Sequence, residues 1–166
     1  MDKVNVLGVK VGKYSIDSAA DRIVQYLKDG ERRKSVFTPN SEIIMMGYKD
    51  PEFCKLLNRA DILTADGIGV VYASRILKNP IETRAAGYDI ACEVLAKMAP
   101  LGMSVYLFGA KPGVAQTAAE NICKKYPGIV IAGCADGYFD SDTEKLIMIA
   151  DINISDAATS AADKLK

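Results

Sequence analysis

Short β-prone runs alternate along the chain with longer segments in which hydrophobic residues recur at helical spacing. Residues 4–11 alternate and are rich in valine, which predicts a strand or a small hairpin with Gly8 at a bulge or turn. After Ser15 or Asp17 as a cap, apolar residues from 20 to 27 follow the pattern of an amphipathic helix. The same criteria predict strands at residues 34–39, 61–65, 104–108 and 129–133. They predict helices at residues 41–49, 51–57, 70–77, 90–98, 114–125 and 145–150. Asn40, Asp50 and Asp89 are the expected caps of the helices at residues 41–49, 51–57 and 90–98.

Strands that alternate with helices in this way predict an α/β protein with a mostly parallel sheet flanked by helices. A chain of 166 residues suits a single domain with a substantial core. We expect residues 1–150 to form that domain and residues 151–166, which are polar and rich in alanine, to form an irregular or truncated tail.

Composition narrows the classes of function. The 21 basic and 21 acidic residues balance, which argues against a nucleic-acid-binding protein. The sequence contains no histidine, so Ser-His-Asp and Cys-His nucleophiles and histidine-ligated zinc are excluded, and base chemistry falls to Asp, Glu, Lys, Tyr or Cys. Four widely spaced cysteines predict reduced thiols, and no apolar run approaches the roughly 20 residues that span a bilayer.

Polar side chains follow two of the predicted strands at the point where each ends. Thr38 and Asn40 close the strand at residues 34–39, and Asp66 follows the strand at residues 61–65. Because the carboxyl ends of parallel strands meet at one edge of a sheet, we expect these residues to line a cleft. Asp66 could instead only cap the next helix, although its neighbours favour a carboxylate aimed into the cleft, and a cap explains Asn40 equally well.

Other candidates suit the binding of a phosphate. The loop from Gly109 to Gly113, which carries Lys111, leads from a strand into a helix N-terminus, although a plain turn explains it as well. Arg84 would supply a cation, and Tyr138 could stack on a base or a sugar unless it packs on its own helix. One base, a cation and an anion cradle favour sugar transfer from a nucleotide diphosphate donor with inversion. No D-x-D pair appears at the ends of these strands, so we predict no metal or other cofactor.

Several segments resemble, in the same order, the WecG/TagA/CpsF glycosyltransferases of family 26. They are TPNSEII (38–44), ADILTADGIGVVYASR (60–75), ETRAAGYD (82–89), VYLFGAKPGVA (105–115), YPGI (126–129) and DGYF (136–139). The resemblance implies a Rossmann-like glycosyltransferase core. It also implies transfer of N-acetylmannosamine from its UDP conjugate to undecaprenyl-diphosphate-linked N-acetylglucosamine, through a β-1,4 bond, in teichoic acid linkage-unit synthesis.

The resemblance also assigns roles to the candidate residues. Asp66 resembles the general base, and Thr38 and Asn40 resemble groups that contact the sugar. Arg84, the loop at Gly109 with Lys111, and Tyr138 resemble the side of the cleft that binds UDP.

Location and partners follow from the resemblance as well. It implies self-association and a cytoplasmic protein held peripherally at the inner face of the cell membrane through a C-terminal appendage. We expect that appendage, and the glycine-proline-glutamine-glutamate motif before it, to be missing from this chain. The alternatives are a relative that uses UDP-N-acetylmannosaminuronic acid, a non-catalytic nucleotide-binding domain, and an NAD-dependent oxidoreductase without the usual fingerprint.

Overall fold

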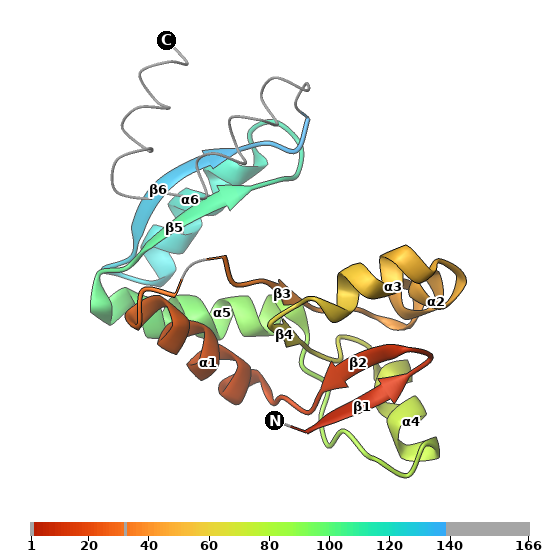
Figure 1. The fold of residues 1–166 in the computed structure, drawn as a ribbon. Helices are drawn as coiled ribbons and strands as arrows, with labels where there is room; N and C mark the ends of the chain where they lie inside the picture. Colours follow the sequence, from red (N-terminus) through yellow and green to blue (C-terminus); the bar gives the residue numbers. More distant parts are fainter. Residues whose placement is uncertain (1, 32, 139–166) are drawn as a thin grey trace. The chain divides into compact units, whose positions relative to one another are not determined.

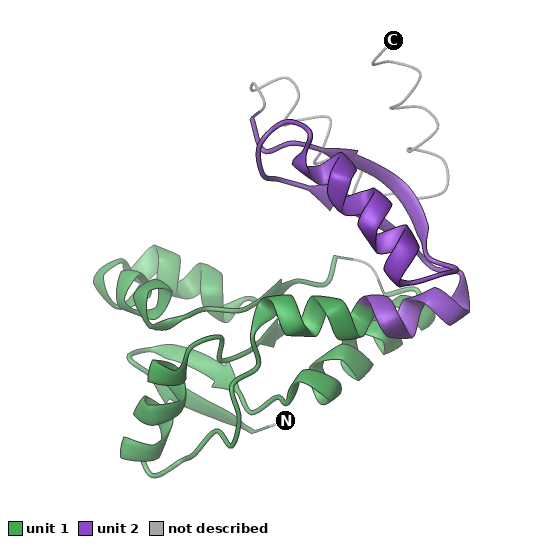
Figure 2. Ribbon diagram, turned by 180° about the vertical axis from the view of Figure 1, so that it is seen from behind, with its two compact units in different colours: residues 1–94 green, residues 95–166 purple. Residues whose placement is uncertain are grey.

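The computed structural model describes residues 2–31 and 33–138, which belong to two compact units. Unit 1 comprises residues 1–94 and unit 2 comprises residues 95–166, shown in green and purple in Figure 2. Helices and strands alternate in both units, which confirms the predicted α/β class (Figure 1). The predicted helix at residues 145–150 and the tail at residues 151–166 lie outside the described residues, and the predicted domain boundary stays a prediction.

The N-terminal strands of unit 1 form a hairpin. Strands β1 (Lys3–Val6) and β2 (Val9–Gly12) pair antiparallel through a two-residue turn at Leu7 and Gly8, which have φ angles of 51° and 94°. Two successive positive φ angles are typical of the tight turns that match strand twist. The hairpin packs against α4 through β1 and against α2 and α3 through β2 (Figure 1).

A short parallel pair forms the centre of unit 1. Strand β3 (Val36–Phe37) pairs with β4 (Ile62–Leu63), and hydrogen bonds from the Thr64 and Asp66 amides to Phe37 and Pro39 continue the pairing. Residues 62–65 are all buried. The predicted strands at residues 34–39 and 61–65 are therefore present, with shorter regular segments than the sequence indicates.

Five helices surround these strands in unit 1. They are α1 (Ile16–Lys28), α2 (Ser41–Lys49), α3 (Pro51–Asn58), α4 (Ile68–Ile76) and α5 (Gly87–Met98), the last of which crosses into unit 2. Ser15, Asn40 and Asp50 each accept backbone N–H groups at the start of α1, α2 and α3. These side chains satisfy amides that a helix start leaves unpaired, so the predicted caps at Asn40 and Asp50 are confirmed, and Ser15 rather than Asp17 caps α1.

Adjacent residues of β4 belong to different hydrophobic clusters. Leu63 packs with the hairpin, α2, α3 and α4, whereas Ile62 packs with Tyr14, α1 and the start of α5. Successive side chains of a strand point to opposite faces, so each face of β4 supports its own cluster. Both faces are covered, as is usual for strands of parallel sheets.

Unit 2 contains a second parallel pair. After the 3-10 turn η1 (Ala99–Leu101), strand β5 (Ser104–Phe108) leads through helix α6 (Val114–Lys125) to strand β6 (Val130–Ala135). The two strands pair in parallel, with a register irregularity between Val105 and Tyr106. Two of the three strand pairs formed by residues 2–138 are thus parallel, in agreement with the predicted pairing, although they do not form one continuous sheet.

Ser74 provides a test of the packing around α4. Its fully buried hydroxyl donates to the carbonyl of Val71 at 2.6 Å and accepts from the amide of Ile81 at 2.8 Å. Ser74→Ala would leave the buried Ile81 amide without a partner, so we expect the free energy of unfolding to fall by roughly 1–3 kcal/mol in urea titrations. Thr83→Ala, in an exposed loop, is the matched control and should change it little.

Candidate active site

The structure brings four of the predicted site residues together at the carboxyl ends of β3 and β4. The Asp66 amide donates to the carbonyl of Pro39 at 3.2 Å, which places Asp66 beside Thr38 and Asn40. Gly67 lies against Asn40, because an added Cβ there would be 3.6 Å from the Asn40 Cα. Arg84 completes the group, with its Nε 3.9 Å from Asp66 Oδ1. The predicted convergence of these side chains is therefore present within unit 1.

Asp66 does not cap the helix that follows it. The residue before α4 is Gly67, and no side chain caps the start of that helix. Asp66 Oδ2 instead accepts the amide of Gly87, the first residue of α5, at 3.3 Å. The carboxylate therefore lies at the N-terminus of a helix 21 residues further along, where the helix dipole favours a negative charge. Its side chain is 31% exposed, so solvent and ligands reach it.

The segment that carries Arg84 is fixed by the buried end of β4. The Ala85 amide donates to the carbonyl of Ala65 at 2.9 Å, and Thr64 Oγ1 donates to the carbonyl of Ala85 at 3.0 Å. Thr64 is fully buried, so this hydroxyl and carbonyl satisfy each other away from water. Sequence reasoning missed Thr64, and its signal is a hydroxyl residue inside an otherwise apolar strand.

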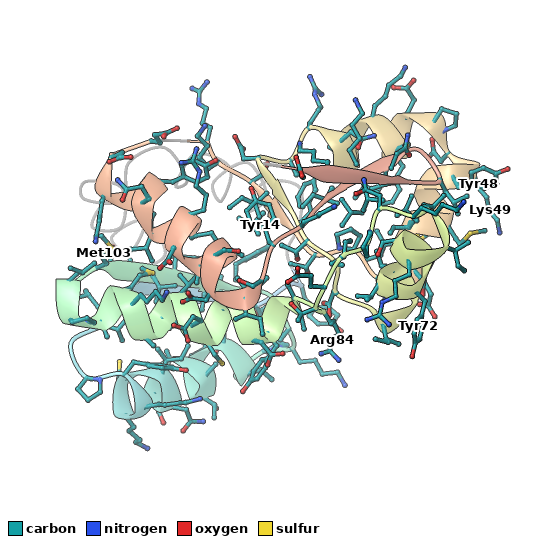
Figure 3. All side chains as sticks on the ribbon, turned by 90° about the horizontal axis from the view of Figure 1, so that it is seen from below. Tyr14, Tyr48, Lys49, Tyr72, Arg84 and Met103 are labelled. Carbon is teal, nitrogen blue, oxygen red and sulfur yellow. The ribbon has the colours of Figure 1, made fainter. Side chains whose placement is uncertain are left out.

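Arg84 lies at the surface of unit 1 between two carboxylates (Figure 3). Its Nη2 is 3.9 Å from Asp89 Oδ2, as far as its Nε is from Asp66, and its side chain is 53% exposed. Exposed pairs at this separation contribute little stability, so the guanidinium remains available to an anionic ligand.

Asp89 was predicted to cap α5, and this is wrong. The helix begins two residues earlier, at Gly87, which places Asp89 in its first turn.

Thr38 and Asn40 contact two different helices. Asn40 Oδ1 accepts the Ile43 amide at 2.9 Å and caps α2, which leaves its amide nitrogen for another partner. Thr38 packs against Gly87 so closely that an added Cβ at Gly87 would lie 2.7 Å from Thr38 Oγ1. Sequence reasoning also missed Gly87, since only the folded chain brings it to Thr38.

The other three predicted site residues belong to unit 2. Gly109, Ala110 and Gly113 have φ angles of 121°, 63° and 86°, so the loop with Lys111 adopts a left-handed backbone that favours glycine. Gly113 precedes α6, and no side chain caps that helix, which leaves its first turn open to an anion. The loops after β5 and β6 meet where the Gly137 amide donates to the carbonyl of Ala110 at 2.9 Å.

Tyr138 follows this contact directly. Its amide donates to Asp136 Oδ1 at 2.9 Å and its side chain is 70% exposed, so the ring is not packed away on a helix. The seven predicted site residues thus form two groups, four in unit 1 and three in unit 2.

Metal-binding and membrane-spanning features are not found in the part of the chain that the structure describes. Among residues 2–31 and 33–138, no three acidic or cysteine side chains gather in a way that could hold a metal ion. No helix within the same ranges combines the length and the hydrophobicity needed to cross a bilayer.

Comparison with known proteins identifies the class of this α/β chain. Residues 4–159 match the model of the glycosyl transferase WecG/TagA/CpsF family, and the chain belongs to that family. It is 32% identical over 139 residues to the N-acetylglucosaminyldiphosphoundecaprenol N-acetyl-beta-D-mannosaminyltransferase of Bacillus subtilis (strain 168), covering 84% of this chain and 54% of that protein.

Two further relatives carry the same name. The protein of Bacillus spizizenii (strain ATCC 23059 / NRRL B-14472 / W23) is 32% identical over 81% of this chain and 54% of its own length. That of Staphylococcus aureus (strain NCTC 8325 / PS 47) is 29% identical over 87% of this chain and 57% of its own length. The chain therefore spans about half the length of these relatives.

The close approach of Gly87 to Thr38 provides a second test. We expect Gly87→Ala to destabilise unit 1 by roughly 1–3 kcal/mol, because the new methyl group must displace a side chain at the end of β3. Adding Thr38→Ala removes the nearest atom, so the double variant should recover part of the loss in a double-mutant cycle of urea unfolding.

Gly69→Ala is the matched control for that experiment. Gly69 also lies in the first turn of a helix, but its added Cβ would meet Ser41 Oγ at 3.4 Å, an ordinary contact. Equal destabilisation by Gly87→Ala and Gly69→Ala would contradict the proposed crowding.

Proposed function

We propose that this chain carries the core of an inverting, metal-independent glycosyltransferase. Its donor is UDP-N-acetylmannosamine and its acceptor is undecaprenyl-diphosphate-linked N-acetylglucosamine, joined in a β-1,4 bond during teichoic acid linkage-unit synthesis. Membership of the WecG/TagA/CpsF family and the names of the relatives support this reaction. The observation that carries it is the Asp66 carboxylate, which follows a buried strand and is partly exposed.

Asp66 is the proposed general base. Its Oδ2 is oriented by the Gly87 amide, while Oδ1 lies 3.9 Å from Arg84 Nε, beyond hydrogen-bond distance, and can accept a proton. As the acceptor hydroxyl attacks the anomeric carbon, its proton passes to Asp66 and a new carbon–oxygen bond forms. The bond from the anomeric carbon to the diphosphate breaks on the opposite face, and its electron pair leaves with UDP.

The leaving diphosphate needs positive charge or fixed donors in place of a metal. We assign this role to Arg84, to Lys111 and the loop at Gly109, and to the uncapped first turn of α6. The exposed ring of Tyr138 is available to stack on the base or sugar of the donor. Thr38 and the amide nitrogen of Asn40 are the proposed contacts to the transferred sugar.

The proposed acceptor also defines where the protein acts. A substrate carried on a polyprenyl diphosphate is confined to a membrane, so we propose a cytoplasmic protein that works peripherally at the inner face of the cell membrane. Self-association and membrane contact through a C-terminal segment belong to the same proposal.

The catalytic role of Asp66 is tested by Asp66→Asn. The amide oxygen of asparagine can still accept from Gly87, so the fold should be kept, while the loss of a base should reduce transfer by about 100- to 10,000-fold. The measurement is release of UDP from UDP-N-acetylmannosamine in the presence of a lipid-diphosphate acceptor. Asp89→Asn removes the other carboxylate beside Arg84 and is the matched control. Full activity of Asp66→Asn would refute the proposed mechanism.

UDP binding is tested separately by calorimetry in the presence of a chelator. We expect saturable binding of UDP without a metal, no comparable binding of NAD, and about tenfold weaker UDP binding in Arg84→Gln, since a charged hydrogen bond to phosphate is lost. Binding of UDP that needs added Mg²⁺ would contradict the metal-independent proposal. UDP binding with no transfer by the unaltered chain would favour the non-catalytic nucleotide-binding alternative.

A further inference from the structure

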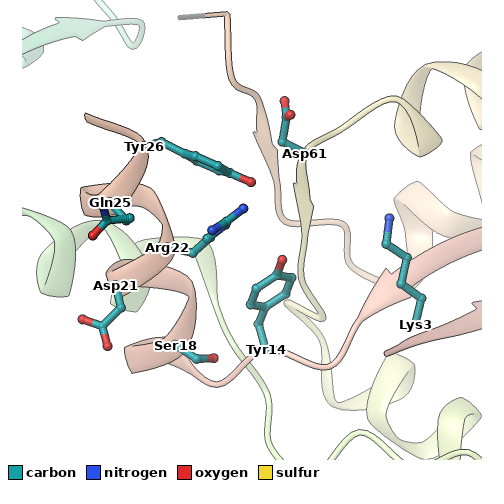
Figure 4. Close-up of a pocket in the computed structure, with 8 residues that line it drawn as sticks. All are labelled: Lys3, Tyr14, Ser18, Asp21, Arg22, Gln25, Tyr26 and Asp61. Carbon is teal, nitrogen blue, oxygen red and sulfur yellow. The ribbon is translucent and has the colours of Figure 1, made fainter. Parts of the chain in front are cut away.

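Unit 1 contains a pocket that none of the predicted site residues lines. Its volume is about 720 Å³, and it lies between α1 and the residues that precede β4 (Figure 4). Asp61, on its rim, comes just before β4, whereas Asp66 comes after that strand. Five residues of extended chain span roughly 16 Å, so the pocket and the candidate active site lie at opposite ends of the strand.

Two buried tyrosines turn their hydroxyl groups into this pocket. Tyr14 is 9% exposed and Tyr26 is 8% exposed, and both rings pack in the hydrophobic cluster beneath α1. Figure 4 shows the Tyr14 hydroxyl facing the pocket. Burial is the main cause that raises the pKa of Tyr14, so its hydroxyl keeps its proton and can donate to a ligand.

Arg22 adds a cation between the two hydroxyl groups. Its guanidinium lies 4.5 Å from the centre of the Tyr26 ring and faces the same space (Figure 4). A hydrogen bond to the Tyr26 side chain is the main cause that raises the pKa of Arg22, so the guanidinium keeps its charge beside that hydroxyl. A guanidinium has five N–H donors, so others remain for a ligand. Three donor groups, two hydroxyls and one guanidinium, therefore face the same space.

The Asp61 carboxylate on the rim is already paired with a cation, Lys34. Asp61 Oδ2 accepts the Ser35 amide at 2.9 Å, and its Oδ1 is 3.2 Å from Lys34 Nζ. Asp21 and Gln25 also line the pocket from α1, and Lys3 faces it from β1. The centre thus offers donors for an oxyanion, while the rim offers acceptors for hydroxyl groups.

We propose that this pocket binds a small phosphate-bearing molecule, with its oxyanion held by Tyr14, Arg22 and Tyr26 and its hydroxyl groups held at the rim. A monosaccharide phosphate has this chemistry, and free inorganic phosphate shares its anionic part. The pocket shares no residue with the proposed donor site, so the proposal neither requires nor replaces that function.

The test is calorimetry of the whole chain with glucose 6-phosphate, inorganic phosphate and glucose at constant ionic strength. We expect saturable binding of the sugar phosphate, weaker competition by inorganic phosphate, and none by glucose. Tyr14→Phe keeps the ring in its cluster and removes only the hydroxyl, so it should weaken binding about tenfold, and Arg22→Gln at least as much. UDP binding should be the same in both variants.

Arg75→Gln is the matched control, because Arg75 also stacks on a tyrosine, Tyr72, at 5.7 Å but lies outside the pocket. The proposal would be overturned if Tyr14→Phe and Arg22→Gln bound the sugar phosphate as tightly as the unaltered chain, or if Arg75→Gln weakened binding as much as they do. Equal heats on titration with chloride would also overturn it. Inorganic phosphate that binds as tightly as the sugar phosphate would support the oxyanion site and identify free phosphate as its ligand. Loss of UDP binding with intact sugar-phosphate binding would count against the proposed function alone.

Discussion

The candidate site of unit 1 depends on the burial of β4 and on the hydrogen bonds along both of its edges. On one edge, the amides of Thr64 and Asp66 donate to the chain that continues β3. On the other edge, the Thr64 hydroxyl and the Ala65 carbonyl bind the two polar groups of the Ala85 backbone. Because buried polar groups must be paired, neither edge can shift without cost. This constraint holds Asp66 and Arg84 in fixed places although 17 residues separate them in the chain.

The polar residues at these strand ends use one side-chain atom for the fold and leave another for the proposed ligand. Asn40 uses its carbonyl oxygen to cap α2 and Asp66 uses one carboxylate oxygen to bind the start of α5. Each side chain keeps a second polar atom, the amide nitrogen or the other oxygen. A role as a helix cap and a role in binding are therefore compatible in one residue, and fixing one atom orients the other.

Local patterns in the sequence predicted the described helices, the parallel pairs and three helix caps. The spacing of hydrophobic residues and the capping of helices both depend on residues within one turn or one strand. The contacts that assemble the site were beyond such patterns. Thr64 binds Ala85, and Gly87 packs against Thr38, through separations that only the folded chain closes. The same limit explains the misplaced cap at Asp89, since the partner of the Gly87 amide is Asp66 from another strand end.

Two aspartates at the two ends of β4 differ in how far their carboxylate oxygens are already engaged. The Ser35 amide, together with Lys34 and against the effect of burial, holds the pKa of Asp61 below its usual range. A lowered pKa makes that carboxylate a weaker proton acceptor, and its oxygens are already engaged by Ser35 and Lys34. Among the residues that the structure describes, the Asp66 carboxylate has one hydrogen bond of 3.3 Å and one ion pair of 3.9 Å. Proton transfer requires an oxygen that can come within hydrogen-bond reach of the substrate, and the weaker engagement of Asp66 Oδ1 is the reason for proposing Asp66 rather than Asp61 as the base.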